Sequence, residues 1–145
     1  RVRLLLIGDI EDLNGFKRQF YSKIANDNRI IHIGLQEDIK TFLSITTIYV
    51  HPSHREGLSN SIMEACAMGI PCVVSSIPGN LELIEDELNG LVAEESNVDS
   101  FKNQIIRLID NRDLRIKIGN QARKNIIKKY DQRIVWSHIR RFYNK

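Results

Sequence analysis

The sequence has 145 residues, of which 42% are hydrophobic and 27% charged, so it can form one domain with a substantial core and is too apolar for a disordered chain. Its apolar runs fall far short of the roughly 20 residues of a membrane-spanning helix, and the first residues, RVRLLLIGD, contain no signal-peptide cleavage site. We therefore expect a soluble protein.

Basic residues are concentrated near the C-terminus, although the formal net charge is only +3. Residues 111–145 contain 11 of the 21 Lys and Arg residues but two of the 18 acidic residues. This asymmetry is typical either of a surface that attracts phosphates, anionic lipid or nucleic acid, or of a solvated helix face.

The two cysteines, Cys66 and Cys72, fall in a predicted helix and in the strand that follows it. Neither has a partner at the spacing of a zinc site. We expect both to be buried, reduced thiols, which indicates a reducing compartment.

The first half of the chain alternates between strand and helix patterns. Residues 2–8, VRLLLIG, form a nearly continuous apolar run, which is typical of a parallel strand covered on both faces. Residues 13–26 place apolar side chains at helical spacing, and the short apolar run IIHIG follows at 30–34. A short helix at 36–45 and the β-branched strand TTIYVHP at 46–52 continue the alternation.

The alternation continues after residue 52. A helix over about 59–69 is predicted to end at Gly69, and Pro71 then begins the strand PCVVSS. Residues 78–80, PGN, are predicted to form a turn, and LELIEDE, at 81–87, a short helix.

The last predicted elements are a short strand and the terminal helices. NGLVA, at 89–93, is the strand, and residues 96–111 are a helix capped by Ser96 or Asn97. Residues 114–143 remain helical, with breaks expected near Gly119 and at 130–131. The predicted buried stripe of the helix at 96–111 consists of Val98, Phe101, Ile105, Leu108 and Ile109.

This alternation predicts an α/β fold with a Rossmann-like parallel sheet, helices on both of its faces and further helices at the C-terminus. Ligands of such sheets bind beyond the carboxyl ends of the strands, where the loop after strand 46–52 lies. That loop directly precedes a helix N-terminus, whose unpaired N–H groups and partial positive charge attract phosphate. Gly57 would allow close approach of the backbone, so the sequence predicts an anion site here.

Two glutamates lie at this loop and helix. The carboxylate of Glu64 suits a vicinal diol such as a ribose, but the S-x-x-E pattern from Ser61 to Glu64 equally fits a helix capping box. Glu56 is a ligand contact, a solvated loop charge or a partner of Arg55.

Two histidines lie in the same region. His51 and His54 either line the pocket or are structural or solvated, because no acid at metal-ligand spacing accompanies them. We expect no metal site.

Residues 53–73 follow the pattern S-x-x-E-G-L-S-x-S-x-x-E-A-x-A-x-G-x-P-x-V. This run resembles the donor-binding segment of family 4 glycosyltransferases, which are retaining enzymes with the two-domain GT-B fold, and Glu56 and Glu64 match its E-x7-E motif. LLLIGD and IIHIG resemble the second and third strands of the C-terminal domain, and PGNLELIEDELNGLV resembles its G-x-x-E-x-I loop. The resemblance implies that residues 1–145 are the nucleotide-sugar-binding C-terminal half of such a protein without its first strand.

The resemblance also implies roles for particular residues. Glu56 would be the catalytic residue that contacts hydroxyls of the transferred sugar, and Glu64 would bind the ribose diol. His51 is expected to line the donor pocket. The remaining expected donor contacts are the N–H groups of Gly57, Leu58 and Ser59 for the sugar and diphosphate, and Gly34 and Leu35 near the base.

The implied reaction transfers a sugar from a nucleoside diphosphate sugar to an acceptor hydroxyl with retention of configuration. In such a front-face reaction the leaving phosphate helps to deprotonate the acceptor, so stabilising the phosphate charge is the main catalytic task. No metal cofactor and no nucleic acid partner are expected, and the acceptor would be a glycan or a lipid-linked molecule.

The chain departs from the family pattern at its start. The loop that carries the family's diphosphate-gripping Arg and Lys would precede Arg1, and the acceptor-binding N-terminal domain is missing, so we expect this chain alone to be inactive. The terminal helices at 114–145 are expected to contact the missing domain through an apolar surface around Ile134, Trp136 and Phe142. We expect a cytoplasmic protein whose basic tail contacts the membrane surface.

Two alternatives stay open on the sequence. A GT-B epimerase of nucleotide sugars would share the helix-held diphosphate, and a nucleotide-binding module without catalysis would share the whole pattern. A receiver domain is disfavoured, because TTIYVHP ends in His-Pro where an Asp is needed and the later strands end without a lysine.

Overall fold

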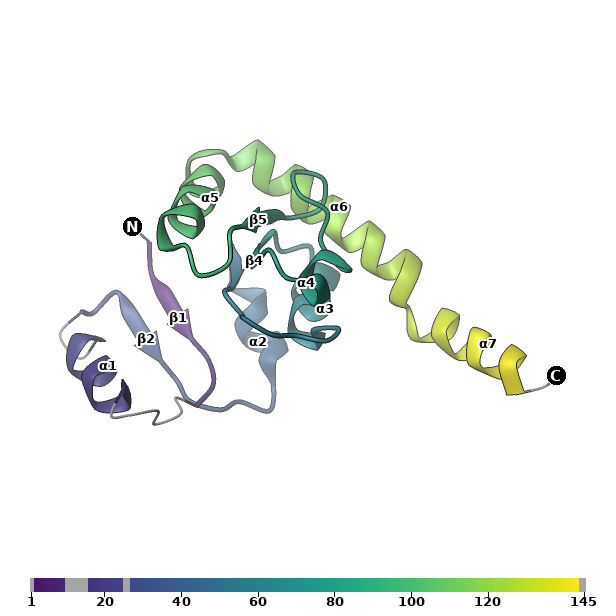
Figure 1. Ribbon diagram of the computed structural model, residues 1–145, viewed down its shortest axis with the longest axis horizontal. Coiled ribbons are helices and arrows are strands. Elements are labelled where there is room, and N and C mark those ends of the chain that lie inside the picture. The colour runs from purple at the N-terminus through teal and green to yellow at the C-terminus, as the bar shows by residue number, and fades with distance from the viewer. Residues whose placement is uncertain (1, 10–15, 25–26, 144–145) are drawn as a thin grey trace. The chain divides into compact units, whose positions relative to one another are not determined.

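The computed structural model describes residues 2–9, 16–24 and 27–143, and Figure 1 shows the course of the chain. The chain forms two compact units, residues 1–39 and residues 40–145. Among the residues described, none of the helices combines the length and the apolar character needed to cross a lipid bilayer.

The N-terminal unit contains β1 (Leu4–Leu6), α1 (Phe16–Ile24) and β2 (Ile30–His32). β1 and β2 pair in parallel with Leu4 opposite Ile30, which confirms the parallel arrangement predicted for these strands. The side chain of Leu4 is 47% exposed, so the prediction that both faces of this strand are covered is wrong within this unit. Residues 13–15 and 25–26 of the predicted first helix lie outside the described residues.

The larger unit has three parallel strands at its centre, in the order β3 (Tyr49–His51), β4 (Cys72–Ser75) and β5 (Leu91–Ala93). Helix α2 (Ile39–Ser44) precedes β3, and α3 (Asn60–Ala67) connects β3 to β4. Between β4 and β5 lies α4 (Pro78–Leu81). The C-terminal helices are α5 (Val98–Asp110), α6 (Arg112–Tyr130) and α7 (Gln132–Tyr143). The predicted α/β fold with parallel strands and flanking helices is confirmed.

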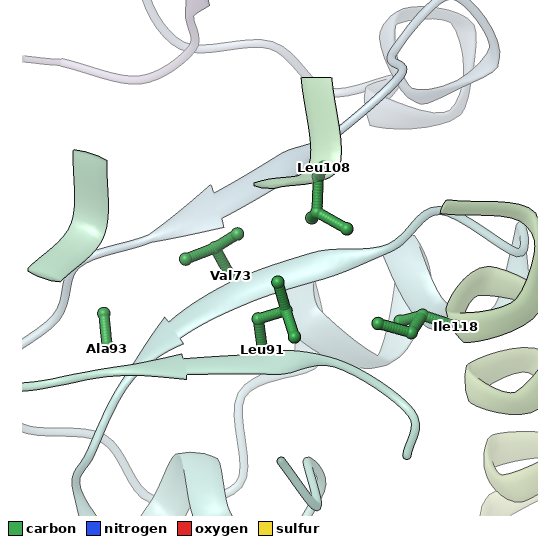
Figure 2. Packing of buried hydrophobic residues seen from close by; sticks show 5 residues of the cluster. All are labelled: Val73, Leu91, Ala93, Leu108 and Ile118. Atoms are coloured by element: carbon green, nitrogen blue, oxygen red, sulfur yellow. The ribbon is translucent and has the colours of Figure 1, made fainter. Parts of the chain in front are cut away.

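Helices cover both faces of the three-stranded sheet. Alternate residues of a strand point to opposite faces, and Val73 of β4 packs with Leu91 and Leu108 while its neighbour Cys72 contacts Cys66 of α3. Figure 2 shows Leu108 of α5 and Ile118 of α6 directed toward Val73 and Leu91. All of these side chains are essentially inaccessible to solvent, so the core of this unit lies between the sheet and its helices.

The stripe predicted for α5 is right at its centre and wrong at its ends. Leu108 is buried, and Phe101 and Ile105 pack against the core. Val98, the first residue of α5, is 80% exposed and Ile109 is 36% exposed, although Leu108, in the same last turn, is fully buried. Asn97 is the cap, since its Oδ1 accepts a hydrogen bond from the N–H of Ser100 at 3.0 Å.

The segment after β4 also differs from the prediction. The helix begins at Pro78 and ends at Leu81, so PGN is its first turn, and residues 82–87 are not helical. Proline at the first helical position explains the early start, since its missing N–H would have no partner there. Asp86 instead forms an isolated bridge with Gly90 next to β5, and its carboxylate accepts a hydrogen bond from the N–H of Val92.

Two glycines bring α3 and α6 into contact. Gly69, with φ +75°, ends α3 in the αL conformation, and the N–H of Ile70 donates to the Ala65 carbonyl as in a Schellman motif. α6 runs without a break through Gly119, contrary to the prediction. The close approach of α3 requires a glycine here, because a Cβ at this position would overlap the carbonyl oxygen of Gly69. The guanidinium of Arg123 donates to the Ala67 carbonyl at 2.8 Å and so fixes the same helix end.

The predicted break near residue 130 is confirmed, and it separates α6 from α7. The carboxylate of Asp131 accepts hydrogen bonds from the side chain and backbone N–H of Arg133, which lowers the pKa of Asp131 to about 2. α7 extends away from the three strands, as Figure 1 shows, and none of its residues is buried.

Gly119→Ala should reduce the free energy of unfolding by about 1–3 kcal/mol, because the added methyl group forces α3 and α6 apart. Helix propensity alone predicts the opposite sign, a gain of up to about 1 kcal/mol. Urea unfolding of the chain measures the change. Gly57→Ala, whose Cβ would meet nothing within 4 Å, is the control, and a stabilised Gly119→Ala protein would contradict the packing argument.

Candidate functional site

The loop between β3 and α3 lies at the carboxyl end of β3, at the edge where the sequence predicted ligand binding. β3 pairs in parallel with β4, so the residues that follow β4 lie at the same edge. The loop after β5 reaches this edge as well, because His54 Nδ1 lies 3.3 Å from Glu95 Oε1 and 3.4 Å from Ser96 Oγ. His54 thus connects two loops, and its side chain is 70% exposed.

Glu56 is held by neighbours other than Arg55. Its Oε1 atom lies 3.0 Å from His51 Nε2 and accepts a hydrogen bond from Ser53 Oγ at 3.1 Å. Among the described residues, no group pairs with Arg55 or donates to the Oε2 atom of Glu56. One oxygen of this carboxylate is therefore occupied by the protein, and the other is available to a ligand.

The hydrogen bond to Glu56 determines the tautomer of His51. An ionised carboxylate only accepts hydrogen bonds, so His51 must donate through Nε2. Its Nδ1 atom lies 3.3 Å from the hydroxyl of Tyr49, and the two rings are stacked. Burial raises the pKa of Tyr49, with a hydrogen bond to Ser61 acting in the opposite direction.

The N-terminus of α3 is capped by Ser59, which is buried. The Ser59 hydroxyl accepts from the N–H of Ile62 at 3.5 Å, and the carbonyl of Ser59 accepts from the N–H of Met63. The capping box predicted from Ser61 to Glu64 is therefore wrong, because the helix begins two residues earlier than that box requires. Glu64 is the fifth residue of α3 and is exposed, so helix capping does not account for it.

Gly57 and Leu58 occupy the turn between Glu56 and the helix. Leu58 is 46% exposed, and none of the described residues accepts a hydrogen bond from the N–H of either residue. Both N–H groups precede the positive end of α3, which is favourable for an anion. The structure thus places the predicted site residues of this region at the end of β3, on the loop that follows and on α3: His51, Glu56, Gly57, Leu58, Ser59 and Glu64.

Gly34 and Leu35 belong to the N-terminal unit, which is described by itself. Gly34 follows β2, has φ +66°, and its carbonyl accepts from the N–H of Gly8 at 2.8 Å. The side chain of Leu35 is 74% exposed. Their predicted place near a nucleotide base stays a prediction.

Three residues under the loop were not predicted as site residues. The hydroxyl of Ser75, the last residue of β4, donates to the Ser53 carbonyl, and Asn80 Nδ2 donates to the carbonyl and the hydroxyl of Ser75, each at 3.0 Å. A Cβ at Gly79 would overlap the Glu56 and Gly57 carbonyls. The only signal in the sequence was that strand PCVVSS and the turn PGN end at the same edge.

The two cysteines are packed between α3 and β4 and take no part in a metal site. Their sulfur atoms are 3.7 Å apart, both are free thiols and both are fully buried, as predicted. The hydrogen bond with Cys66 and burial raise the pKa of Cys72. In the part of the chain that the structure describes, no three His, Cys, Asp or Glu side chains are grouped to hold a metal ion.

Comparison with known proteins identifies the family of the chain. Residues 1–125 match the family described as glycosyl transferases group 1, and the chain belongs to this family. The chain is 33% identical over 133 residues to a UDP-Gal:alpha-D-GlcNAc-diphosphoundecaprenol alpha-1,3-galactosyltransferase of Escherichia coli. This match covers 88% of the chain and 34% of the relative, so the chain spans about a third of that protein.

Solved glycosyltransferases share the fold. Anabaena Alr3699/HepE, solved with UDP, matches 99% of the chain with a TM-score of 0.90 at 22% identity, and the match covers 41% of that protein. The C-terminal domain of a group 1 glycosyl transferase, LpcC, from Francisella tularensis matches 90% of the chain with a TM-score of 0.79 at 27% identity, over 70% of that chain. The fold is that of one Rossmann-like half of a GT-B glycosyltransferase.

Proposed function

We propose that the chain is the donor-binding, C-terminal half of a retaining family 4 glycosyltransferase that uses a nucleoside diphosphate sugar. The observation that carries the proposal is the loop of Glu56, next to the N-terminus of α3: among the described residues, no group donates to Glu56 Oε2 or accepts from the N–H groups of Gly57 and Leu58. Glu64 lies on α3, and its exposed carboxylate pairs with none of those residues. The matching family consists of glycosyl transferases, and UDP is bound in a structural neighbour.

In the proposed donor complex the two glutamates bind different parts of the donor. Glu64 accepts hydrogen bonds from the ribose diol, and the Oε2 atom of Glu56 accepts one from a hydroxyl of the sugar. The N–H groups of Gly57 and Leu58 and the N-terminus of α3 bind the diphosphate. Gly34 and Leu35 would contact the base.

The proposed reaction breaks the bond between the anomeric carbon and the diphosphate oxygen and forms a bond from that carbon to the acceptor oxygen on the same face. The acceptor proton passes to the leaving phosphate. Positive ends of dipoles at the phosphate lower the barrier by stabilising its developing charge, and no metal is required in this scheme. The acceptor is a glycan or a lipid-linked molecule, as in the galactosyltransferase named above, and the reaction would take place in the cytoplasm.

Glu64→Ala in the intact protein should weaken UDP binding about tenfold to a hundredfold, because hydrogen bonds to a charged group are lost. Glu56→Ala should leave UDP affinity within about twofold and chiefly lower turnover, since it contacts the sugar. Calorimetry with UDP and a transfer assay with UDP-sugars measure both effects.

Glu85→Ala is the control for this pair, since Glu85 is an exposed glutamate in the loop that leads into β5. Unchanged UDP affinity in Glu64→Ala would exclude the ribose contact. Conversion of one nucleotide sugar into its epimer without any acceptor would favour an epimerase instead.

We further propose that α7 packs against an N-terminal domain of the same protein and that residues 1–145 alone do not catalyse transfer. The helix presents an apolar stripe at spacings of three and four residues, and every member is at least 37% exposed. An unpartnered stripe of this kind marks an interaction surface. Its residues are Val135, Trp136, Ile139, Phe142 and Tyr143.

Phe142→Glu should change the free energy of unfolding of chain 1–145 by less than about 0.5 kcal/mol, because the side chain is 78% exposed. In the intact protein the same substitution should lower stability and turnover, since it places a charge in the domain interface. Urea unfolding of both proteins and a transfer assay give the comparison. Ser137→Glu, on the opposite face of α7, should have no such effect, and an unaffected intact Phe142→Glu protein would contradict the interface.

We also propose that α6 contacts an anionic membrane surface, where a lipid-linked acceptor would be found. Lys117, Lys124 and Lys128 are exposed and are spaced so that they share one face of α6. None of the three forms an ion pair with a described residue. Each lysine near an anionic surface contributes about 1 kcal/mol of attraction.

Replacing these three lysines with Gln should reduce the binding of the intact protein to anionic vesicles about a hundredfold, and should not change its weak binding to neutral vesicles. Flotation with phosphatidylglycerol-containing and pure phosphatidylcholine vesicles measures this. Lys102→Gln, on α5, is the control. Equal binding of the unaltered protein to both vesicle types would eliminate the membrane contact.

A further inference from the structure

The loop of Glu56 rests on α4 and on the end of β4. Gly79 lies directly below the Glu56–Gly57 peptide, with an ideal Cβ only 2.8 Å from the Glu56 carbonyl carbon. Ser75 and Asn80, on either side of this contact, are 1% and 0% exposed. The loop is thus positioned by buried polar groups as well as by its own sequence.

These groups connect the core to the carboxylate through the backbone and side chain of Ser53. Asn80 Nδ2 donates to Ser75 Oγ at 3.0 Å, and Ser75 Oγ donates to the Ser53 carbonyl. The Ser53 hydroxyl lies 3.1 Å from both Glu56 Oε1 and the Arg55 carbonyl, so its single hydrogen is shared between the carboxylate and the loop backbone. A hydroxyl can donate only one hydrogen bond, and it rotates to suit its partners. Because Asn80 donates to Ser75 Oγ, the Ser75 hydrogen must point elsewhere, and the Ser53 carbonyl is its acceptor.

This arrangement has an energetic cost at the side-chain amide of Asn80. Within the described part of the chain, the Oδ1 atom of Asn80 is buried and has no hydrogen-bond partner. An apolar side chain of the same size would avoid that loss. Asn89, the other buried asparagine of this segment, instead uses both ends of its amide, since Oδ1 accepts from the Glu85 N–H and Nδ2 donates to the Leu83 carbonyl. Packing alone therefore does not explain an asparagine at position 80, and the hydrogen bonds that its Nδ2 atom donates to Ser75 do.

We propose that Asn80 is a positioning residue for Glu56, which acts through Ser75 and Ser53 to orient the carboxylate toward the sugar of the donor. The proposal deepens the proposed function and rests on it for the identity of the ligand. Asn80 touches neither ligand nor carboxylate, so its loss should affect only interactions that depend on the orientation of Glu56. The nucleotide contact of Glu64 should be unaffected, because α3 is fixed separately by Gly69, Gly119 and Arg123.

The test compares Asn80→Leu with Asn89→Leu in the intact protein. Both substitutions keep the approximate volume of the side chain and remove one buried amide. Calorimetry gives the ratio of the affinities for UDP and for whichever of UDP-glucose and UDP-galactose binds the unaltered protein more tightly. Asn80→Leu should lower the relative affinity for the UDP-sugar about fivefold or more and leave UDP affinity within about twofold. Asn89→Leu should leave the ratio unchanged even if it destabilises the fold.

Ser75→Ala removes the hydroxyl that links Asn80 to the loop and should change the ratio of UDP and UDP-sugar affinities in the same direction. It replaces Asn80→Leu in the test if that variant does not fold. In a Glu56→Gln protein, Asn80→Leu should have little further effect on the ratio, because the two changes act on one contact. An equal loss of UDP and UDP-sugar affinity, or no loss of either, would overturn the positioning role.

A ligand-free measurement separates this proposal from the proposed function. Asn80→Leu and Ser75→Ala should be coupled in the unfolding equilibrium constant by at least about threefold, because Asn80 Nδ2 donates to Ser75 Oγ, whereas Asn89→Leu and Ser75→Ala should be additive. A protein that binds neither UDP nor UDP-sugar would refute the proposed function, and this double-mutant cycle would still decide whether Asn80 acts through Ser75. Additivity of Asn80→Leu and Ser75→Ala would show that Asn80 does not act through Ser75.

Discussion

The attachment of the β3–α3 loop to β4 is the contact on which the rest of the site depends. The hydroxyl of Ser75 donates to the carbonyl of Ser53, and this places the chain between β3 and α3 over the end of the sheet. The contacts of His54 with Glu95 and Ser96 and the packing of Gly79 against the loop backbone add to this attachment. Parallel pairing of β3 with β4 makes the contact possible, because it brings the carboxyl ends of both strands to one edge.

The orientation of α3 depends on a second contact, far from the loop. Gly69 and Gly119 let the backbones at the end of α3 and in α6 come into contact, and Arg123 donates to the carbonyl of Ala67, the last residue of α3. A helix carries its dipole and its side chains as a rigid unit, so fixing its C-terminus also fixes the N-terminus that follows the loop. α6 therefore determines where Glu64 and the positive end of α3 lie, although none of its residues belongs to the site.

The two glutamates illustrate how the surroundings of a side chain separate a ligand contact from a structural role. Glu56 has one oxygen satisfied by His51 and Ser53, which holds the carboxylate in place and leaves its other oxygen for a partner outside the loop. Glu64 pairs with none of the residues that the structure describes and lies beyond the capping positions of its helix. Both glutamates fall within residues 1–125, which match the glycosyl transferases group 1 family.

Much of the fold follows from the sequence alone. The alternating apolar runs predicted all five strands and their parallel pairing, since short apolar runs separated by amphipathic helices have few other arrangements. Gly69 and Pro71 predicted the end of α3, because the αL conformation and the missing N–H are local properties. The spacing of the two glutamates singled out the loop after β3, and the rule that ligands bind beyond the carboxyl ends of parallel strands predicted that this loop lies at the binding edge.

The tertiary structure decided those features for which contacts between elements outweigh the local sequence pattern. The capping box from Ser61 to Glu64 was wrong, because Ser59 is the cap of α3. Gly119 lies within α6, and its role is the close contact with Gly69 although glycine usually weakens a helix. Val98 and Ile109 are exposed, whereas Leu108 between them on the predicted stripe is buried. The hydrogen bonds from Asn80 to Ser75 and from Ser75 to Ser53 connect α4, β4 and the β3–α3 loop, and Ser75 and Ser53 are 22 positions apart along the chain. Sequence patterns report the period of one element, and contacts between elements exist only once the chain has folded.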